Sequence, residues 1–257
     1  MKKRYGRYRE FLKDGVRQRI DFSQTDQSRG LPVPPIEKPF DPQSRRIDLP
    51  EPNAWTDIAA AGLLSAIDRR QSHRGFTADP LKLKELSFLL WATQGIRQVL
   101  PSGSARRTVP SAGCRHALET YLCISRVTGL DPGLYRYLPV EHQLLLEHRD
   151  DRLHHRIVPA TLGQSFTGQA AAVFIWTAIP DRMEWRYDIA AHKVILLDAG
   201  HVCQNLYLAC EAIGAGTCAI AAYNQELIDQ LVGVDGRDEF VIYLAPVGKI
   251  REGSEDE

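Results

Sequence analysis

The residues from Arg69 to Phe76, Arg-Arg-Gln-Ser-His-Arg-Gly-Phe, carry the side chains of this chain that are best suited to hold an anion. Arginine provides planar, permanently charged N–H donors, and a serine hydroxyl adds a short donor beside them. Such a group can bind a phosphate and an electron-rich ring in one place. A solvated basic helix end, whose cations complement the helix dipole, is the simpler explanation of these residues alone.

Two further segments have a similar character. Residues 107–113, Arg-Thr-Val-Pro-Ser-Ala-Gly, combine a backbone fixed by proline and glycine with small residues that let a flat ligand approach. Residues 246–251, Pro-Val-Gly-Lys-Ile-Arg, place two cations directly after the last predicted strand. Each segment by itself is also explained as an ordinary turn or a solvated tail.

Composition limits the partners of the chain. It has 257 residues, with 32 Lys plus Arg and 32 Asp plus Glu, so the formal net charge is zero. No global field attracts nucleic acid or an anionic membrane, and an anion site must be local. No apolar run is long enough to span a bilayer, and no apolar segment follows the basic N-terminus as in a secretory signal. The 5 cysteines show no CxxC spacing; buried free thiols in a reducing compartment predict a cytoplasmic protein.

Common enzyme motifs are missing from the sequence. It contains no GxGxxG after a predicted strand, no GxxxxGK[ST] and no GxSxG, which argues against a Rossmann cofactor site, a P-loop NTPase and a serine hydrolase. Three polar side chains could in principle ligate a metal: Asp198, His201 and Asn205. The set lacks the additional His and Cys residues of a structural zinc site. We therefore expect no metal centre and assign these side chains to helix packing.

The chain divides into an irregular, proline-rich arm over residues 1–50, with a short helix near its start, and a domain over residues 51–257. Hydrophobic periodicity and turn residues predict the elements of the domain, and segment 97–108 is expected to be a mobile loop. Mixed helices and strands without strict βαβ alternation indicate an α+β fold. The predicted helices begin after Thr56 and span 80–95, 152–162, 187–213 and 225–232, and the predicted strands span 120–127, 135–138, 143–147, 170–179, 217–222 and 240–247.

The predicted helix over 187–213 is apolar nearly all round between Val194 and Ile213. A helix of that kind is buried on all sides. A single domain of this size seldom buries one so fully, so we expect part of it to lie at a subunit interface.

Six short motifs occur in one order along the chain: Arg-Arg-x-Ser-x-Arg-x-Phe at 69–76, Pro-Ser-Ala-Gly at 110–113, Gly-Leu-Tyr-Arg-Tyr-x-Pro at 133–139, Ala-Gly-His-Val-x-Gln-Asn-Leu-x-Leu at 199–208, Gly-x-Gly at 214–216 and Pro-x-Gly at 246–248. This set resembles the nitroreductase superfamily of FMN enzymes, and more closely its SagB/ThcOx-type dehydrogenase branch. The resemblance covers about residues 55 to 250. It implies an α+β sandwich with a central, mostly antiparallel sheet flanked by helices, and an intertwined homodimer with two FMN molecules at its interface.

The resemblance also implies a role for individual positions. Residues 70 and 72 would bind the FMN phosphate and ribityl chain, residue 74 would lie near flavin N1 and O2, and residues 249 and 251 would complete the phosphate site. Segment 110–113 of the other subunit would cover the ring, and the backbone of 221–222 would face flavin N5 and O4. The implied cofactor ligands are Arg69, Arg70, Ser72, Arg74, Arg107, Pro110, Ser111, Gly113, Ala221, Ala222, Lys249 and Arg251, with Arg74 and Tyr187 as the catalytic side chains.

One position departs from the branch pattern. Peptide-azoline dehydrogenases use a Lys-Tyr pair near the start of the long helix for proton removal, where this chain has Arg186-Tyr187. Arginine is a poor general base because its pKa exceeds about 12. Tyr187 remains a candidate acid or base, but the lysine role is lost, which weakens the azoline interpretation without affecting flavin binding.

The sequence therefore predicts an FMN-dependent oxidoreductase that transfers hydride through flavin N5, in a ping-pong scheme, to or from a small conjugated substrate such as a nitro compound or quinone, with NAD(P)H as donor. The first alternative is an azoline dehydrogenase of thiazole/oxazole peptide maturation, with a peptide substrate. Two others are a flavin-binding protein without turnover and a structural dimer without a cofactor.

Overall fold

The structure is a computed structural model that describes residues 5–56, 58 and 62–251. Its main sheet has the strand order β1-β6-β5-β4-β7-β9-β8, and every neighbouring pair in it is antiparallel. The strands are β1 (Arg46–Asp48), β4 (Leu118–Ile124), β5 (Gly133–Leu138), β6 (Gln143–Arg149), β7 (Ala172–Ala178), β8 (Ala215–Thr217) and β9 (Phe240–Lys249).

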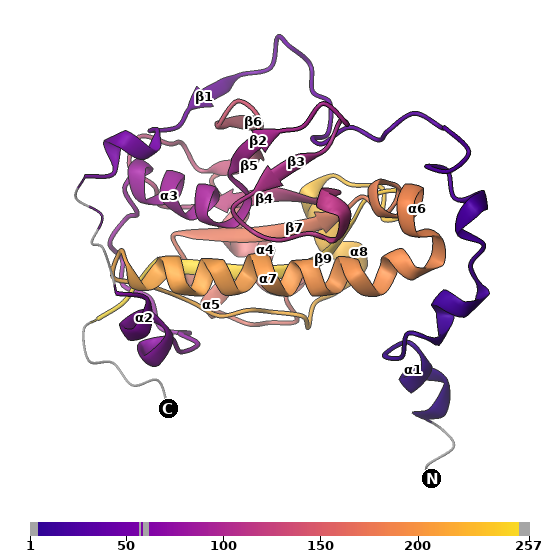
Figure 1. Cartoon of the computed structure of the whole chain (residues 1–257). Coiled ribbons are helices and arrows are strands. Elements are labelled where there is room, and N and C mark those ends of the chain that lie inside the picture. The colour runs from indigo at the N-terminus through magenta and orange to yellow at the C-terminus, as the bar shows by residue number, and fades with distance from the viewer. Residues whose placement is uncertain (1–4, 57, 59–61, 252–257) are drawn as a thin grey trace.

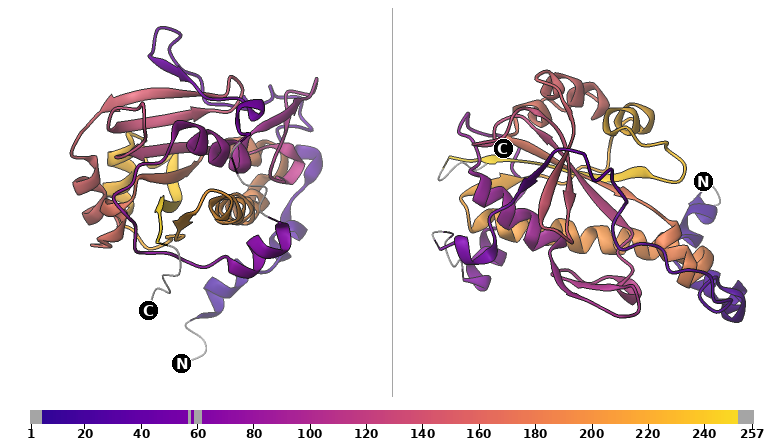
Figure 2. Two further views of the ribbon diagram at one scale, coloured as in Figure 1. Left: turned by 90° about the vertical axis from the view of Figure 1, so that its left-hand side faces the viewer. Right: turned by 90° about the horizontal axis from the view of Figure 1, so that it is seen from above.

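Helices cover both faces of this sheet. The long α7 (Ala191–Glu211) and α3 (Leu83–Gln94) lie on the side toward the viewer in Figure 1, and α4 (Leu153–Ala160), α5 (Phe166–Gln169) and α8 (Gln225–Val232) lie on the far side, as the view from above in Figure 2 also shows. Each face has its own apolar core. The predicted α+β class with a central antiparallel sheet flanked by helices is confirmed.

Strand β7 shows how the sheet is held between these layers. Phe174 and Trp176 pack into the core on the α7 side, and Val173 and Ile175 pack into the core on the α4 side. All residues of β7 are buried, as the continuous apolar run over 170–179 predicted for a strand covered on both faces.

The segment from 97 to 108 is not the loop that the sequence predicted. It forms an antiparallel hairpin of β2 (Ile96–Val99) and β3 (Ala105–Arg107), separate from the main sheet. The polar residues that suggested a loop lie mostly on its exposed side, while Ala105 is buried. The polar residues and the glycine of this segment favour a loop, but the pairing of its two halves with each other stabilises strands instead.

The long helix predicted over 187–213 is present as α7, which begins four residues later and ends two residues earlier than predicted. Helix α6 (Asp181–Tyr187) ends where Asp188 takes a φ of 49°, and α7 begins at Ala191. The interruption turns α6 away from the axis of α7 (Figure 1). Within one chain α7 is not buried on all sides, because Leu196 and Leu197 are about half exposed, at 49% and 54%.

Other predicted boundaries shift by a few residues. The helix expected from Pro80 begins at Leu83, because Leu81 forms a parallel bridge with Val127 and the Glu85 carboxylate accepts a hydrogen bond from the Lys82 N–H. The strand expected over 217–222 is only β8 with a later bridge between Ile220 and Leu244. The helix expected after Thr56 is described as α2 (Leu63–Arg69), and its predicted start extends into 57 and 59–61, outside the described residues.

Buried arginines hold the N-terminal arm against the domain. The arm runs from α1 (Gly6–Glu10), past α6 and over the top of the molecule to β1 (Figure 1). Its main-chain carbonyls at 34, 36 and 38 accept hydrogen bonds from Arg115, Arg107 and Arg136, respectively, at 3.0, 2.6 and 2.9 Å. An extended chain whose carbonyls are bound in this way is a fixed part of the fold.

Glu37 makes the attachment of the arm sensitive to pH. Burial raises the pKa of Glu37 to about 7, the charges of Glu141 and Glu119 act in the same direction, and the Val140 N–H, 3.0 Å from Oε2, opposes them. Because the pKa of Glu37 is higher in the folded chain than in the unfolded chain, the folded chain binds a proton more tightly. Protonation therefore stabilises the fold at low pH, and this stabilisation is lost as pH rises toward and through about 7.

We therefore expect the free energy of unfolding to fall by about 1–2 kcal/mol between pH 5 and pH 8 through Glu37, a figure reduced for its partial exposure. Glu37→Gln should remove this part of the pH dependence in urea unfolding, and the exposed Glu226→Gln should not. An unchanged pH dependence in Glu37→Gln would show that the residue titrates normally.

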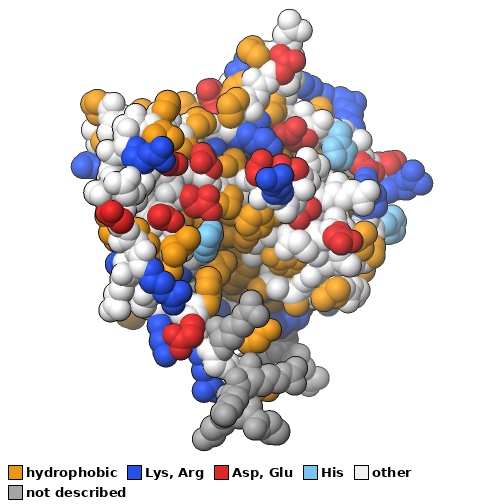
Figure 3. All heavy atoms as spheres, turned by 90° about the vertical axis from the view of Figure 1, so that its right-hand side faces the viewer, with side chains coloured by type: hydrophobic (Ala, Val, Ile, Leu, Met, Phe, Trp, Pro, Cys, Tyr) orange, Lys and Arg blue, Asp and Glu red, His pale blue; other side chains and the backbone are white. Residues whose placement is uncertain are grey.

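One face of the molecule illustrates the balance of charges that the formal net charge of zero implies. On the face shown in Figure 3, acidic and basic side chains are interspersed around apolar side chains, and neither sign dominates. Within the described residues, no helix combines the length and apolar character needed to cross a membrane.

Candidate functional site

The segment that follows α2 lies along the ends of β8 and β9. The His73 N–H donates to the Thr217 carbonyl at 2.9 Å, and the Thr77 N–H donates to the Lys249 carbonyl at 2.8 Å. A Cβ at Gly216 would lie 2.6 Å from the Cβ of His73, and a Cβ at Gly248 would lie 2.9 Å from that of Phe76. The glycines of the Gly-x-Gly and Pro-x-Gly motifs are thus the positions that let this segment approach the strands.

Tyr207 of α7 joins the two parts of this region. Its hydroxyl lies 2.9 Å from Ser72 Oγ and accepts a hydrogen bond from the Ala219 N–H at 2.8 Å, and the Arg70 guanidinium lies 5.3 Å from its ring centroid. The sequence analysis missed Tyr207, which occupies an unspecified position of the 199–208 motif. Its only sequence signal is a phenol in an otherwise apolar helix, since a buried tyrosine hydroxyl usually finds a partner.

The predicted cations gather at the same end of the molecule. Lys249 Nζ lies 2.8 Å from Glu85 Oε1 and 2.5 Å from the Ile213 carbonyl, at the C-terminal end of α7. Arg69 pairs with Glu211 at 3.7 Å. Arg74 and Arg251 are exposed on the segments that carry Ser72 and Lys249. The structure therefore brings the segment that carries Arg70 and Ser72 to the strand that carries Lys249, from separate parts of the sequence.

The predicted ring-facing backbone follows shortly after Ala219, whose N–H donates to Tyr207. Ala221 and Ala222 are exposed and follow Ile220, which is bridged to Leu244, and the Ala222 carbonyl accepts a hydrogen bond from Gln164 at 2.9 Å. The Ala219 N–H bond to Tyr207 thus holds this segment close to the Ser72 segment.

The remaining predicted ligands form a second group at the other end of α7. In the 110–113 loop, Pro110 is exposed, Ser111 Oγ accepts from the His116 N–H at 2.9 Å, and the Ala112 N–H donates weakly to Asp198 Oδ1 at 3.4 Å. Gly113 has a φ of 59°, and a Cβ there would lie 2.7 Å from the Tyr187 hydroxyl. Burial raises the pKa of the Asp198 carboxyl, opposed by hydrogen bonding to the loop.

The two groups do not meet within one chain. Asp198 and Tyr207 both belong to α7, and at 1.5 Å per residue their positions are about 13 Å apart along the helix axis. The 110–113 loop therefore lies beside Asp198 and Tyr187, away from the region around Tyr207.

Arg107, another predicted ligand, holds the arm within this chain. It is 5% exposed, and its guanidinium donates to Gln94 Oε1 at 2.9 Å and to the Ile36 carbonyl at 2.6 Å. Burial lowers its pKa to about 10, so it remains charged at neutral pH. The sequence did not indicate these contacts, because the Ile36 carbonyl lies in the arm, 71 residues away along the chain.

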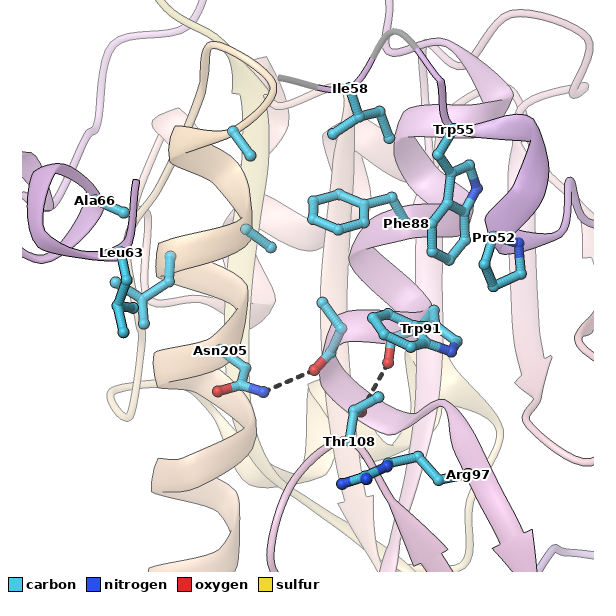
Figure 4. Close-up of a pocket in the computed structure, with 14 residues that line it drawn as sticks. Pro52, Trp55, Ile58, Leu63, Ala66, Phe88, Trp91, Arg97, Thr108 and Asn205 are labelled. Carbon is cyan, nitrogen blue, oxygen red and sulfur yellow. Dashed lines mark hydrogen bonds between the residues drawn. The ribbon is translucent and has the colours of Figure 1, made fainter. Parts of the chain in front are cut away.

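A large apolar cleft opens between α2, α3 and α7 (Figure 4). Its volume is about 860 Å³, and Trp55, Phe88 and Trp91 form its aromatic wall opposite Leu63 and Ala66. On α7 it is lined by Asn205, Leu208, Ala209 and Ala212. At 100° per residue these side chains face away from Tyr207, so the cleft and the cationic region use different sides of the helix.

Comparison with known proteins agrees with this architecture. The model of the Nitroreductase family matches residues 67–249. A nitroreductase-family protein of Methanocaldococcus jannaschii is 31% identical over 75% of this chain and 93% of its own length. The trifolitoxin-processing protein TfxB of Rhizobium leguminosarum is 23% identical, over 58% of this chain and 41% of TfxB.

Solved structures extend the comparison to the fold. A nitroreductase-family structure from Ralstonia eutropha superposes with a TM-score of 0.66 at 29% identity, over 86% of this chain and all of that one. A chain of the Escherichia coli microcin synthetase McbBCD complex superposes with a TM-score of 0.60 at 18% identity, over 84% and 79% of the two chains, and this match speaks for the fold alone.

The family model spans most of the chain and includes the segment after α2, the 110–113 loop, α7 and the β8–β9 edge. The family resemblance stated from the motifs is thereby confirmed: the chain belongs to the nitroreductase family and is an oxidoreductase of that family.

Proposed function

We propose that this chain is an FMN-dependent oxidoreductase that binds the FMN phosphate with Arg70, Ser72 and Lys249. The observation that carries the proposal is that Arg70 and Ser72 contact Tyr207 on a segment whose backbone pairs with Thr217 of β8 and Lys249 of β9. Guanidinium, ammonium and hydroxyl donors together are the chemistry that recognises a phosphate.

The local structure fits such a group. Arg74 and Arg251 add cations on the same two segments, and Glu85 is the acidic partner of Lys249. Positive charge therefore exceeds negative charge around the phosphate donors, although the chain as a whole is neutral. A bound phosphate would share Lys249 with Glu85.

When bound, FMN supplies the redox chemistry by accepting and passing on a hydride at N5. The protein supplies position and field: we assign Arg74 to stabilise negative charge at the N1 and O2 edge, and the backbone of Ala221 and Ala222 to orient the ring. No side-chain nucleophile is needed. Donor and acceptor would use the same site in turn, a ping-pong scheme.

A homodimer completes this proposal, because the 110–113 loop lies away from Tyr207 in its own chain. Helix α2 exposes Leu63, Leu64 and Ile67 at 68%, 84% and 56%, and it lies beside the C-terminal part of α7, which carries half-exposed leucines, Leu196 and Leu197, nearer its start. Apolar side chains gathered on adjacent helices mark an interaction surface. A second copy on this surface would place its 110–113 loop over the ring.

Leu64→Glu is therefore expected to shift the protein from dimer to monomer and to lower FMN retention with it, because a charge would enter an apolar interface. Sedimentation velocity and the flavin content of the same sample measure both effects. Leu162→Glu, at a leucine 62% exposed just after α4, is the matched control and should change neither. A Leu64→Glu protein that remains dimeric would contradict this interface.

Turnover tests the function itself. The purified protein is loaded with FMN and assayed with NADH or NADPH and a nitroaromatic or quinone acceptor. Parallel double-reciprocal lines are expected for a ping-pong enzyme. A bound flavin that neither donor reduces would contradict a reductase.

Azoline oxidation in peptide maturation is the second candidate. TfxB is named for processing of trifolitoxin, and the McbBCD structure holds truncated pro-MccB17. Tyr187 lies against Gly113 in the loop that we place over the ring, where a phenol could move a proton. An azoline peptide oxidised by the holoenzyme would favour this candidate, and a genomic neighbourhood without a cyclodehydratase or precursor peptide would count against it.

A further inference from the structure

We propose that Tyr207 is the positioning residue of the FMN site: its hydroxyl orients Ser72 toward the phosphate and fixes the backbone beside the flavin ring, and its ring fixes Arg70. The inference rests on the proposed FMN function and adds a residue that makes no assumed contact with FMN itself. It also links the two ends of the cofactor through one side chain.

The hydrogen bonds at the phenol oxygen have a defined polarity. The Ala219 N–H can only donate, so the Tyr207 oxygen accepts from it at 2.8 Å. The phenol proton is then best used toward Ser72 Oγ, 2.9 Å away, because the opposite direction would leave that proton without an acceptor among the described neighbours of the hydroxyl. Ser72 consequently keeps its own O–H proton for an anion.

The ring of Tyr207 acts on the neighbouring cation. The Arg70 Cζ lies 5.3 Å from the ring centroid, a cation–π distance, and no carboxylate is recorded as an ion-pair partner of Arg70 within the described part of the chain. Stacking on a π-face leaves the in-plane N–H donors of the guanidinium available for a phosphate. One tyrosine thus prepares both the hydroxyl and the guanidinium for the same ligand.

The bond to Ala219 extends the effect to the ring. Tyr207 is 9% exposed and packed in the core, so its oxygen is a fixed point. Ala219 precedes the exposed Ala221–Ala222 backbone, which we place beside flavin N5. Loss of the phenol oxygen would free both the Ser72 segment and this backbone, which are otherwise separate in sequence.

Two variants separate the hydroxyl from the ring. Tyr207→Phe removes the hydroxyl and keeps the ring under Arg70, and it should raise the Kd for FMN about three- to tenfold. Tyr207→Leu removes both and should raise the Kd by about a further three- to fivefold. Tyr135→Phe is the control, because it also deletes one phenol hydroxyl that is hydrogen-bonded to the main chain. Here the hydroxyl donates to the Asp131 carbonyl at 2.8 Å, and the residue lies on β5.

Four readouts distinguish positioning from a loss of general stability. In Tyr207→Phe the melting temperature should match that of Tyr135→Phe, while the visible absorption bands of bound FMN shift because the backbone beside the ring is released. Ser72→Ala should cost less affinity in the Tyr207→Phe background than in the wild type, since contacting groups couple in a double-mutant cycle. The Kd for riboflavin, which lacks the phosphate, should change less than that for FMN.

The possible failures are distinguishable. In the first case the wild type binds FMN, Tyr207→Phe has the wild-type Kd and spectrum, and the effects of Tyr207→Phe and Ser72→Ala on the Kd are additive. Tyr207 is then no positioning residue, although the FMN function stands. If the wild type itself takes up no FMN, the proposed function fails and this inference fails with it.

Discussion

Arg70→Ala should raise the Kd for FMN about ten- to a hundredfold, while the reduction potential of the flavin that still binds stays close to that of the wild type. Hydrogen bonds to charged groups contribute about 1.5–3 kcal/mol each, and a tenfold change in Kd corresponds to about 1.4 kcal/mol. We place Arg70 at the phosphate, remote from the redox-active ring, so its removal acts on affinity alone. Fluorescence titration and potentiometry with a reference dye measure the two quantities.

Arg74→Ala provides the contrast. This side chain is assigned to the N1 and O2 edge, so its loss should lower the reduction potential as well as weaken retention, because the field that stabilises the reduced flavin is removed. Arg106→Ala, at an exposed arginine of the β2–β3 hairpin, controls for the loss of one surface cation. An Arg70→Ala protein with wild-type affinity would place the phosphate elsewhere.

Arg182→Met should destabilise the fold by about 3–5 kcal/mol, because it leaves a buried carboxylate without its main partner. Arg182 and Glu119 are 1% and 2% exposed, with Nη2 and Oε1 2.5 Å apart. Glu119 also accepts the Lys38 N–H of the arm at 2.8 Å, so the arm should loosen in the same variant. Urea unfolding gives the free energy, and limited proteolysis of the arm reports the local effect.

The double variant Arg182→Met, Glu119→Gln tests the cause of that loss. Arg182→Met leaves Glu119 with only the more distant Arg136, at 4.0 Å, as an ion-pair partner. Neutralising the carboxylate removes this poorly compensated charge, so the double variant should be more stable than Arg182→Met alone. Equal stability of the two would mean that the cost arises from packing of the long Arg182 side chain.

The layers of the fold were readable from the sequence because they follow from local apolar patterns. The run over 170–179 gave β7, and the periodicity over 225–232 gave α8 with its observed bounds. The glycines of the motifs mark where the segment after α2 lies on β8 and β9. These features depend on residues that are neighbours in the sequence and on the positions of glycines, and both can be read from a single sequence.

Features that depend on distant partners were not readable. Arg107 looked like an anion ligand because its partners, Gln94 and the Ile36 carbonyl, lie in a helix and in the arm. The break before α7 at Asp188 was not readable either, because one residue with a positive φ does not change the hydrophobic periodicity of the residues around it. Tyr207 was overlooked because its partners Ser72 and Ala219 come from separate segments.

Binding of FMN compared with riboflavin is the most direct measurement of the central claim, that Arg70, Ser72 and Lys249 form a phosphate site for a flavin. Titration of the purified 257-residue chain with each compound, followed by quenching of flavin fluorescence, should give a Kd for FMN about 100-fold or more below that for riboflavin, since several charge-assisted hydrogen bonds depend on the phosphate. Equal affinity for the two flavins, or no uptake of either, would contradict the account.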